Sequence, residues 1–203
     1  MNPIFRHPCA SLLLILFLGA SSPLQATASE EYQTLVLGAG CFWCVEAFYE
    51  ALPGVVAVVS GYAGGERPNP TYKDVSAGRT KHAEVVEITF DPSTTSLPTL
   101  LDFFWTTHDP TDPTGVWPDF GPQYRSIILY QDEAQKLAIE ASQSKFQSTA
   151  KTRKPIATQI VPLIEFYPAE DYHQDFVRKN PGHPYVRRIA IPKLKKLGLP
   201  VPE

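Results

Sequence analysis

Hydrophobic and polar residues follow one another along the first half of the chain in a pattern that predicts a strand, a helix and two further strands. An apolar run at residues 34–37 ends in the glycine-rich turn 38–40, and apolar side chains then recur at helical spacing as far as the Pro-Gly pair 53–54. Residues 55–59 form a β-branched run. A long loop rich in proline and glycine separates this run from a further predicted strand at residues 82–90.

The second half continues with alternating elements. Its first helix carries large apolar side chains on one face, and its second begins at an acidic cap. The final residues, 191–203, have the character of a basic, proline-bounded tail. Helices interleaved with strands predict one domain in which helices pack on a mixed sheet. The expected elements are a helix at residues 96–107, a strand at 125–130, a helix at 132–149, a strand at about 158–166 and a short helix near Tyr172 and His173.

Composition agrees with one globular domain. The chain has 203 residues, of which 43% are hydrophobic and 19% are charged. A chain of this length can bury a sizeable core without disulfide bonds. The formal net charge is −3, so there is no basic field to hold a nucleic-acid backbone, and we expect no nucleic-acid partner.

The beginning of the chain differs in composition from the rest. Before residue 30 an arginine is the only formally charged side chain, an apolar block covers residues 10–20, and an Ala-x-Ala sequence stands at 26–28. The block is too short to cross the ~30 Å hydrocarbon layer as a helix, so the segment is typical of a secretory signal. We predict that residues 1–28 are a cleaved signal peptide, that 29–203 form one domain with a loop-rich C-terminal tail, and that the protein is exported to the periplasm. The alternative is an uncleaved anchor helix.

Two cysteines remain after this leader, Cys41 and Cys44, and both lie where the glycine turn meets the first predicted helix. A disulfide between them would close a very short loop and constrain the unfolded chain little, so a purely structural role is a poor explanation. Free backbone N–H groups and the helix dipole favour an anion at Cys41, which predicts a lowered pKa and a nucleophilic thiolate. Cys44 follows one turn later on the same face. The alternative is that both are small core residues.

The strand at residues 82–90 contains a second candidate. Alternation places Glu84 on the same face as three large apolar side chains, where burial should raise its pKa and keep the carboxyl protonated near neutral pH. Such a group can act as a proton donor. The alternative places Glu84 at an exposed strand end beside His82. Tyr72 and Tyr124 lie at loop ends, where a phenol either reaches a cleft or packs in the core.

Taken together, these motifs resemble the peptide methionine sulfoxide reductases of type A, over nearly all of the chain after the leader. Each motif alone is weak, but their order and spacing are specific. They are Gly40-Cys41-Phe42-Trp43, Gly61-Tyr62-Ala63-Gly64-Gly65, Asn69-Pro70-Thr71-Tyr72, Gly78, His82-Ala83-Glu84, His108-Asp109-Pro110, Gln123-Tyr124-Arg125-Ser126 and Ala169-Glu170-Asp171-Tyr172-His173-Gln174.

The resemblance implies an α/β fold, more specifically an α+β two-layer sandwich in which a mixed sheet has a ferredoxin-like core and long loops. It also implies thiol-dependent reduction of methionine-S-sulfoxide, free or within a protein. In that reaction Cys41 would attack the sulfoxide sulfur, Glu84 would protonate the departing oxygen, and Tyr72 and Tyr124 would hydrogen-bond to that oxygen. Cys41 would end as a sulfenic acid.

Further roles follow from the same resemblance. Phe42 and Trp43 would form the apolar wall that receives the S-methyl group of the substrate, and Asp119 would help to organise the site. No cofactor and no metal are expected, because an external thioredoxin-like donor would supply the electrons. The partners are then oxidised proteins or free methionine sulfoxide and that reductant, and we expect a monomer.

The chain departs from the family pattern at several positions. Family members often have resolving cysteines at two sites that are occupied here by Val186 and Ser76. We therefore favour Cys44 as the residue that attacks the sulfenic acid, as in dithiol oxidoreductases. Direct attack by an external thiol is the alternative. The loop 114–118 lacks the Arg-Gln-Gly character common there, and Trp117 is a candidate to line the substrate cleft instead.

Two other functions fit parts of the sequence. A general dithiol oxidoreductase of thioredoxin type would explain a strand followed by Cys-x-x-Cys at a helix start, but it leaves Glu84 and the tyrosines without a task. A copper- or zinc-binding module is the non-enzymatic alternative, because Cys-x-x-Cys at a loop–helix junction can hold a soft metal. A metal carrier has no need of a bulky Phe-Trp pair between its thiols.

Overall fold

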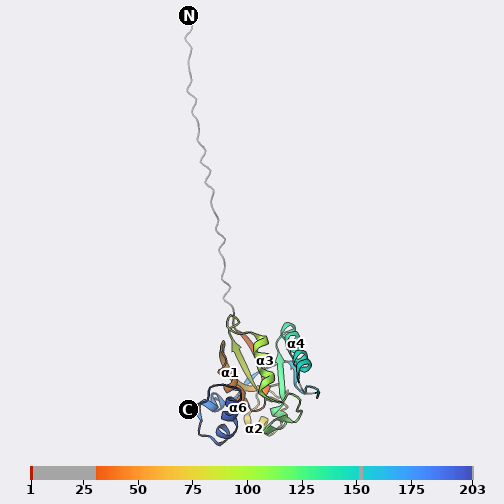
Figure 1. The fold of residues 1–203 in the computed structure, drawn as a ribbon, viewed down its shortest axis with the longest axis vertical. Helices are drawn as coiled ribbons and strands as arrows, with labels where there is room; N and C mark the ends of the chain where they lie inside the picture. Colours follow the sequence, from red (N-terminus) through yellow and green to blue (C-terminus); the bar gives the residue numbers. More distant parts are fainter. Residues whose placement is uncertain (2–30, 151–152, 203) are drawn as a thin grey trace.

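The computed structural model describes residues 31–150 and 153–202, together with Met1 (Figure 1). The predicted signal peptide at residues 1–28 and its cleavage site lie outside these described residues, apart from Met1. Within the described part of the chain, none of the helices has both the length and the apolar character that crossing a membrane would require.

Helices and strands alternate along the described chain. The strands are β1 (Gln33–Ala39), β2 (Val55–Ala63), β3 (Ala83–Phe90), β4 (Gly115–Val116), β5 (Asp119–Phe120), β6 (Ser126–Tyr130), β7 (Gln159–Pro162) and β8 (Tyr167–Pro168). The α-helices are α1 (Phe42–Glu50), α2 (Tyr72–Ser76), α3 (Leu97–Thr107), α4 (Glu133–Thr149), α5 (Phe176–Lys179) and α6 (Ile191–Lys196). Shorter turns are the 3-10 segments η1 (Pro122–Tyr124) and η2 (Asp171–His173), and the π-helical turn η3 (Val186–Ala190).

The main sheet has the strand order β7-β6-β1-β3-β2-β8. All neighbouring strands in it are antiparallel except the parallel pair β6 and β7, so the sheet is mixed as predicted. Helix α1 connects β1 to β2, and α3 lies between β3 and β6 in the chain. The central strands β6-β1-β3-β2 therefore have the β-α-β-β-α-β connection of a ferredoxin-like core, and the predicted fold class is confirmed.

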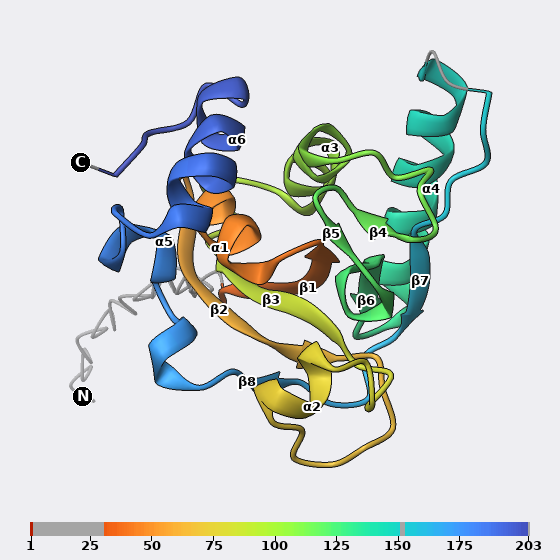
Figure 2. The same cartoon turned by 90° about the horizontal axis from the view of Figure 1, so that it is seen from below.

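The helices and the sheet form two layers. Leu37 of β1 faces Val86 of β3 in register, and both belong to the larger buried cluster together with side chains of α1, α3, α4 and α6. Figure 2 shows α1, α3 and α6 on the same side of the sheet. The opposite face carries a smaller cluster, which is covered by the segment containing Leu163 and Phe166. Cys41 and Cys44 both belong to the larger cluster, on the helical side of the sheet.

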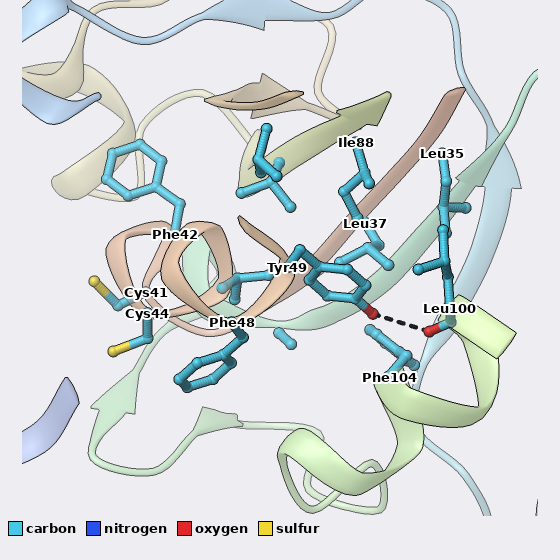
Figure 3. Packing of buried hydrophobic residues seen from close by; sticks show 14 of the residues in the cluster. Leu35, Leu37, Cys41, Phe42, Cys44, Phe48, Tyr49, Ile88, Leu100 and Phe104 are labelled. Atoms are coloured by element: carbon cyan, nitrogen blue, oxygen red, sulfur yellow. Dashed lines mark hydrogen bonds between the residues drawn. The ribbon is translucent and has the colours of Figure 1, made fainter. Parts of the chain in front are cut away.

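Local sequence signals explain where the helices begin. The hydroxyl of Ser96 accepts a hydrogen bond from the backbone of Thr99 at the start of α3, and Asp132 does the same for Gln135 at the start of α4. Both helices begin one residue after the positions predicted from these caps. The phenol of Tyr49 on α1 donates to the carbonyl of Leu100 on α3 at 3.1 Å, which joins the two helices inside the core (Figure 3).

Two sequence predictions differ from the structure. The strand expected at residues 158–166 is shorter: β7 ends at Pro162, and the separate short strand β8 follows only at Tyr167–Pro168. The first part of the expected tail is a helix: residues Ile191–Lys196 form α6, whose Leu194 is 1% exposed within the main core cluster. The proline that suggested a tail stands in the first turn of α6, where its missing N–H costs no hydrogen bond.

Candidate active site

A glycine turn delivers Cys41 to the first turn of α1. Gly40 has φ +93°, a conformation that side chains rarely adopt, and a Cβ placed there would lie 2.9 Å from Cβ of Val116. Cys41 is the N-cap residue of α1, and its carbonyl accepts from the backbone N–H groups of Cys44 and Val45. The predicted strand, glycine turn and helix are confirmed.

Glu84 lies beside the start of this helix. Its carboxyl is 1% exposed, and Oε2 accepts a hydrogen bond of 3.1 Å from the backbone N–H of Phe42. Burial raises the pKa of Glu84 to about 8, although the hydrogen bond from Phe42 opposes the shift. The carboxyl is therefore mostly protonated at neutral pH, as the alternating pattern of β3 predicted. The alternative of an exposed Glu84 is wrong.

The two cysteine sulfurs lie side by side near the beginning of α1 (Figure 3). Both side chains are buried and neither forms a disulfide in this structure. Burial raises the pKa of Cys41, and its hydrogen bond to Cys44 and the nearby Glu84 act in the same direction. The hydrogen bond from Cys41 lowers the pKa of Cys44, and Lys193 adds to this effect.

The prediction of a lowered pKa for Cys41 is therefore wrong for this structure. The cause is local: the side chain of Cys41 accepts no capping hydrogen bond from the first turn, and the N–H of Phe42 is directed to Glu84 instead. The sulfur loses its hydration without gaining a backbone donor.

Tyr72 and Tyr124 both lie close to this centre. Burial is the largest of the causes that raise the pKa of Tyr72 to about 12, and the nearby Glu84 and Cys41 contribute to the same shift. Burial likewise raises the pKa of Tyr124, with contributions from Glu84, Tyr72 and Cys41. Because each of these charges acts on both phenols, the structure brings Cys41, Glu84, Tyr72 and Tyr124 together from four separate segments. Both phenols keep their proton at neutral pH and can donate hydrogen bonds.

Of the two aromatic residues at the start of α1, Phe42 is buried in the core and Trp43 reaches the surface of the site. Phe42 is 1% exposed, with ring centroids 5.8 Å from Tyr62 and 5.0 Å from His173. Trp43 is partly exposed, and its ring stacks on that of Phe176 with centroids 3.7 Å apart. Trp43 is thus the member of the pair with more surface available to a ligand.

Asp119 belongs to a polar group that sequence reasoning did not assemble. Its carboxylate accepts a hydrogen bond of 2.6 Å from the phenol of Tyr185, and the Sγ of Cys44 lies 3.9 Å from the same phenol oxygen. Burial raises the pKa of Asp119, whereas Tyr185 and Lys193 oppose that shift. Lys193 comes from α6, the segment expected to be a tail, and no local pattern indicated that it would lie near Cys44.

Two further residues, Glu170 and His173, line the other side of the site. The carboxylate of Glu170 accepts from the phenol of Tyr62 at 2.8 Å and from the backbone N–H of Tyr72 at 2.9 Å. His173 is 1% exposed and accepts a hydrogen bond from the indole of Trp43. Both belong to the motif at residues 169–174, which sequence analysis identified without assigning it a role.

Trp117 lies on the Asp119 side of the site. It is 67% exposed and lines a cavity of about 390 Å³ together with His108, Val116 and Lys193. Its use in substrate binding stays a prediction. Across the described ranges of the chain, no three His, Cys, Asp or Glu side chains form a group that could hold a metal ion, so the Cys-x-x-Cys pair has no third ligand of these types there.

Comparison with known proteins decides between the remaining alternatives. The family model described as "Peptide methionine sulfoxide reductase" matches residues 33–198, which is most of the chain and includes every candidate site residue. The chain belongs to this family. Membership confirms the resemblance, identifies the protein as an enzyme, and leaves no support for a general dithiol oxidoreductase or a metal carrier.

Relatives show which member of the reductase family it resembles. The peptide methionine sulfoxide reductase MsrA of Sulfolobus acidocaldarius is 48% identical over 164 residues, which are 81% of this chain and 92% of that protein. The reduced form of Mxr1 from Saccharomyces cerevisiae superposes with a TM-score of 0.72 at 32% identity, over 85% of this chain and 93% of the other. Mxr1 in complex with Trx2 gives a TM-score of 0.51 at 26% identity, over 73% and 86%. The reductase is therefore of type A.

Proposed function

We propose that this reductase acts on the S epimer of methionine sulfoxide, with Cys41 as the nucleophile and Glu84 as the acid. The observation that carries the proposal is a buried, protonated carboxyl beside a cysteine at the N-terminus of α1. A sulfoxide oxygen is a poor leaving group until it is protonated, so a sulfur nucleophile and a neutral acid have to act together.

The first half-reaction transfers one oxygen atom. Sγ of Cys41 attacks the sulfoxide sulfur while Glu84 donates a proton to the oxygen, which Tyr72 and Tyr124 hold by hydrogen bonds. The attack forms a bond between Sγ and the substrate sulfur. The S–O bond of the substrate then breaks, the oxygen bonds to Sγ, and the Sγ–S bond breaks, which leaves Cys41 as a sulfenic acid and releases methionine. The thiol proton of Cys41 restores Glu84, so atoms and charge balance.

The second half-reaction forms a disulfide. Cys44 attacks the sulfenic sulfur of Cys41, the oxygen leaves as water, and the new S–S bond joins two residues of the same helix turn. Three features support Cys44 for this step: its hydrogen bond with Cys41, its lowered pKa, and the charge of Lys193 nearby. Asp119 and Tyr185 contact this side of the pair and keep Cys44 oriented toward it.

A thioredoxin-like dithiol is proposed as the donor that reduces this disulfide, and no prosthetic group takes part. The similar Mxr1 protein has been solved in complex with Trx2, which supports a partner of this kind. Free methionine sulfoxide and methionine sulfoxide in a polypeptide are both proposed substrates. Trp43 and the buried Phe42 behind it are proposed as the apolar wall for the S-methyl group.

We also propose that residues 1–28 are removed on export and that the enzyme works in the periplasm. Support comes from the sequence alone, namely the apolar block at 10–20 and the Ala-x-Ala sequence at 26–28. Mass spectrometry of the protein recovered from the periplasm tests this: an N-terminus at Ser29 supports it, whereas retention of Met1 would establish an anchor.

The activity is tested with the two epimers of a methionine sulfoxide substrate and dithiothreitol as reductant. We expect reduction of the S epimer only, and none by the Cys41→Ser variant. Equal turnover of both epimers, or activity that survives in Cys41→Ser, would refute the assignment.

Cys44 is tested by the variant Cys44→Ser. This variant should still form one equivalent of methionine, because the first half-reaction needs only Cys41. Its cycling with thioredoxin should collapse. Unimpaired cycling would show that an external thiol, and not Cys44, attacks the sulfenic acid.

A further inference from the structure

The indole of Trp43 is fixed by two contacts of different kinds. Its ring stacks on Phe176 with an interplanar angle of 7°, which sets the plane of the indole. Tyr185 and His183 also contact the ring in edge geometry, with centroids 5.8 and 6.0 Å away, but the polar N–H of the indole is directed elsewhere. The indole Nε1–H donates a hydrogen bond of 3.0 Å to Nδ1 of His173, and this contact fixes the remaining rotation.

His173 is held in one tautomer by the same contact. An indole N–H can only donate, so Nδ1 of His173 accepts and the ring proton is on Nε2. Burial lowers the pKa of His173, which keeps the imidazole neutral although Glu170 opposes the shift. Its Nε2 has no hydrogen-bond partner in the structure, and the closest carboxylate oxygen is Oε2 of Glu170 at 4.0 Å.

The same imidazole packs against the opposite side of the site. Its centroid is 4.4 Å from the ring of Tyr72 and 5.0 Å from that of Phe42. Glu170, next to it, holds the backbone N–H of Tyr72. His173 therefore fills the space between the proposed methyl wall and a proposed ligand of the sulfoxide oxygen, so a change in its shape moves both.

We propose that His173 is a positioning residue for substrate binding: through Nδ1 it sets the in-plane orientation of Trp43, and thereby the shape of the wall that receives the S-methyl group. The inference rests on the proposed function, in which Trp43 contacts the substrate. His173 itself is 1% exposed and does not reach the reacting atoms, so it acts through Trp43 and not as an acid or base.

The test compares two substitutions of His173. The variant His173→Asn keeps an acceptor at the place of Nδ1, whereas His173→Leu keeps volume but removes the acceptor. We expect His173→Leu to raise KM for methionine sulfoxide about tenfold, the scale of one lost hydrogen bond, with single-turnover kcat changed less than about threefold. His173→Asn should recover most of the wild-type KM. An unchanged KM in His173→Leu, or equal KM values in the two variants, would overturn the proposal.

A second indole in the protein supplies a matched control. Nε1–H of Trp105 donates to the hydroxyl of Ser142 at 2.9 Å, in a buried contact between α3 and α4. Ser142→Ala removes a partner of an indole far from Cys41 in the fold, so it should lower Tm and leave KM unchanged. A comparable rise of KM in Ser142→Ala would show that loss of stability, and not orientation of Trp43, explains the effect.

Two further readings separate this proposal from the proposed function. The ¹H–¹⁵N resonance of the Trp43 indole should shift upfield in His173→Leu and stay near its wild-type position in His173→Asn; no shift in either variant would contradict the hydrogen bond.

In a Trp43→Phe background, His173→Leu should add little to KM, and a full additional effect would overturn the proposal. If Trp43→Phe leaves KM unchanged, the assignment of Trp43 to the methyl-binding wall in the proposed function is refuted. If Trp43→Phe raises KM but His173→Leu does not, only the positioning role of His173 is refuted.

Discussion

At the scale of single residues, the proposed mechanism depends on a carboxyl that stays protonated because it is buried. Glu84 is placed on the inner face of β3 and receives one backbone hydrogen bond, which is too little to keep it ionised. Its neighbour Cys41 is also buried and its pKa is raised, so both groups favour their neutral forms. The charge separation that the reaction needs arises only when the sulfoxide oxygen is present to take the proton.

Replacing Glu84 by glutamine should slow methionine formation in a single turnover by ~10²-fold or more, the usual contribution of a positioned acid. Glutamine keeps the shape and can accept from Phe42, but it has no proton to give. Rapid-quench measurement of methionine checks this. Glu46→Gln is the matched control, because Glu46 is also 1% exposed on α1 with a pKa raised to about 7, yet it faces α5 rather than the cysteines. An unchanged rate in Glu84→Gln would refute the role of the acid.

The raised pKa of Glu84 also makes a prediction for stability. Between an unfolded value of ~4.3 and the folded value of about 8, the folded chain holds a proton that the unfolded chain has released. The contribution of Glu84 to the free energy of unfolding is therefore largest below that window, falls as pH rises through it by up to about 1.4 kcal/mol per pH unit, and is constant above it.

Urea unfolding of the wild type and Glu84→Gln at pH 5, 6.5 and 8 measures this contribution by difference. The variant should become more stable relative to the wild type at each step upward in pH. A difference that does not depend on pH would mean that Glu84 is not protonated in the folded chain.

At the scale of elements, the junction of β1 and α1 positions the chemistry. The strand ends at Ala39, Gly40 turns the chain with a positive φ, and Cys41 caps the helix. Val116 of β4 packs against this turn, so the loop that carries Asp119 is placed relative to Cys41 by the same contact. A side chain at residue 40 would disturb both.

Gly40→Ala should destabilise the fold by about 2 kcal/mol and reduce activity, because it adds left-handed strain and a contact of 2.9 Å with Val116. Gly198→Ala is a suitable control: Gly198 has φ +71°, but a Cβ there meets nothing within 4 Å. The control should lose some stability and no activity. Chemical unfolding and a reductase assay check both, and full activity in Gly40→Ala would contradict the role given to the turn.

Much of this element and its chemistry could be predicted from sequence, because the signals are local. Glycine spacing, helical periodicity and strand alternation predicted the turn at 38–40, the helix after it and the buried face of β3. The contacts of His173 with Trp43, and of Tyr185 with Asp119, join residues 130 and 66 positions apart, and no local pattern encodes them. The pKa of Cys41 was predicted wrongly for a related reason: it depends on where the N–H of Phe42 points, which the sequence does not specify.

At the scale of the whole molecule, the fold brings distant segments to one end of α1. β1 supplies the turn, β3 the acid, α2 and η1 the phenols, and η2 and α6 the contacts on either side of the cysteines. Two of the proposed reacting groups come from one segment: Cys41 is the N-cap of α1, and Cys44 lies in its first turn. The ferredoxin-like core is predictable from the order of elements, whereas α6 was mistaken for part of a tail because it is short and rich in lysine and begins with a proline in its first turn.

The central claim is that Cys41 takes the sulfoxide oxygen and Cys44 then removes it. The most direct test is the mass of the peptide containing residues 41–44 after one turnover without reductant, set against the methionine released. In Cys44→Ser, this peptide should gain one oxygen on Cys41 for each methionine formed; in the wild type it should instead lose two hydrogens, as a disulfide does. Methionine formed without either change at Cys41 would contradict the account.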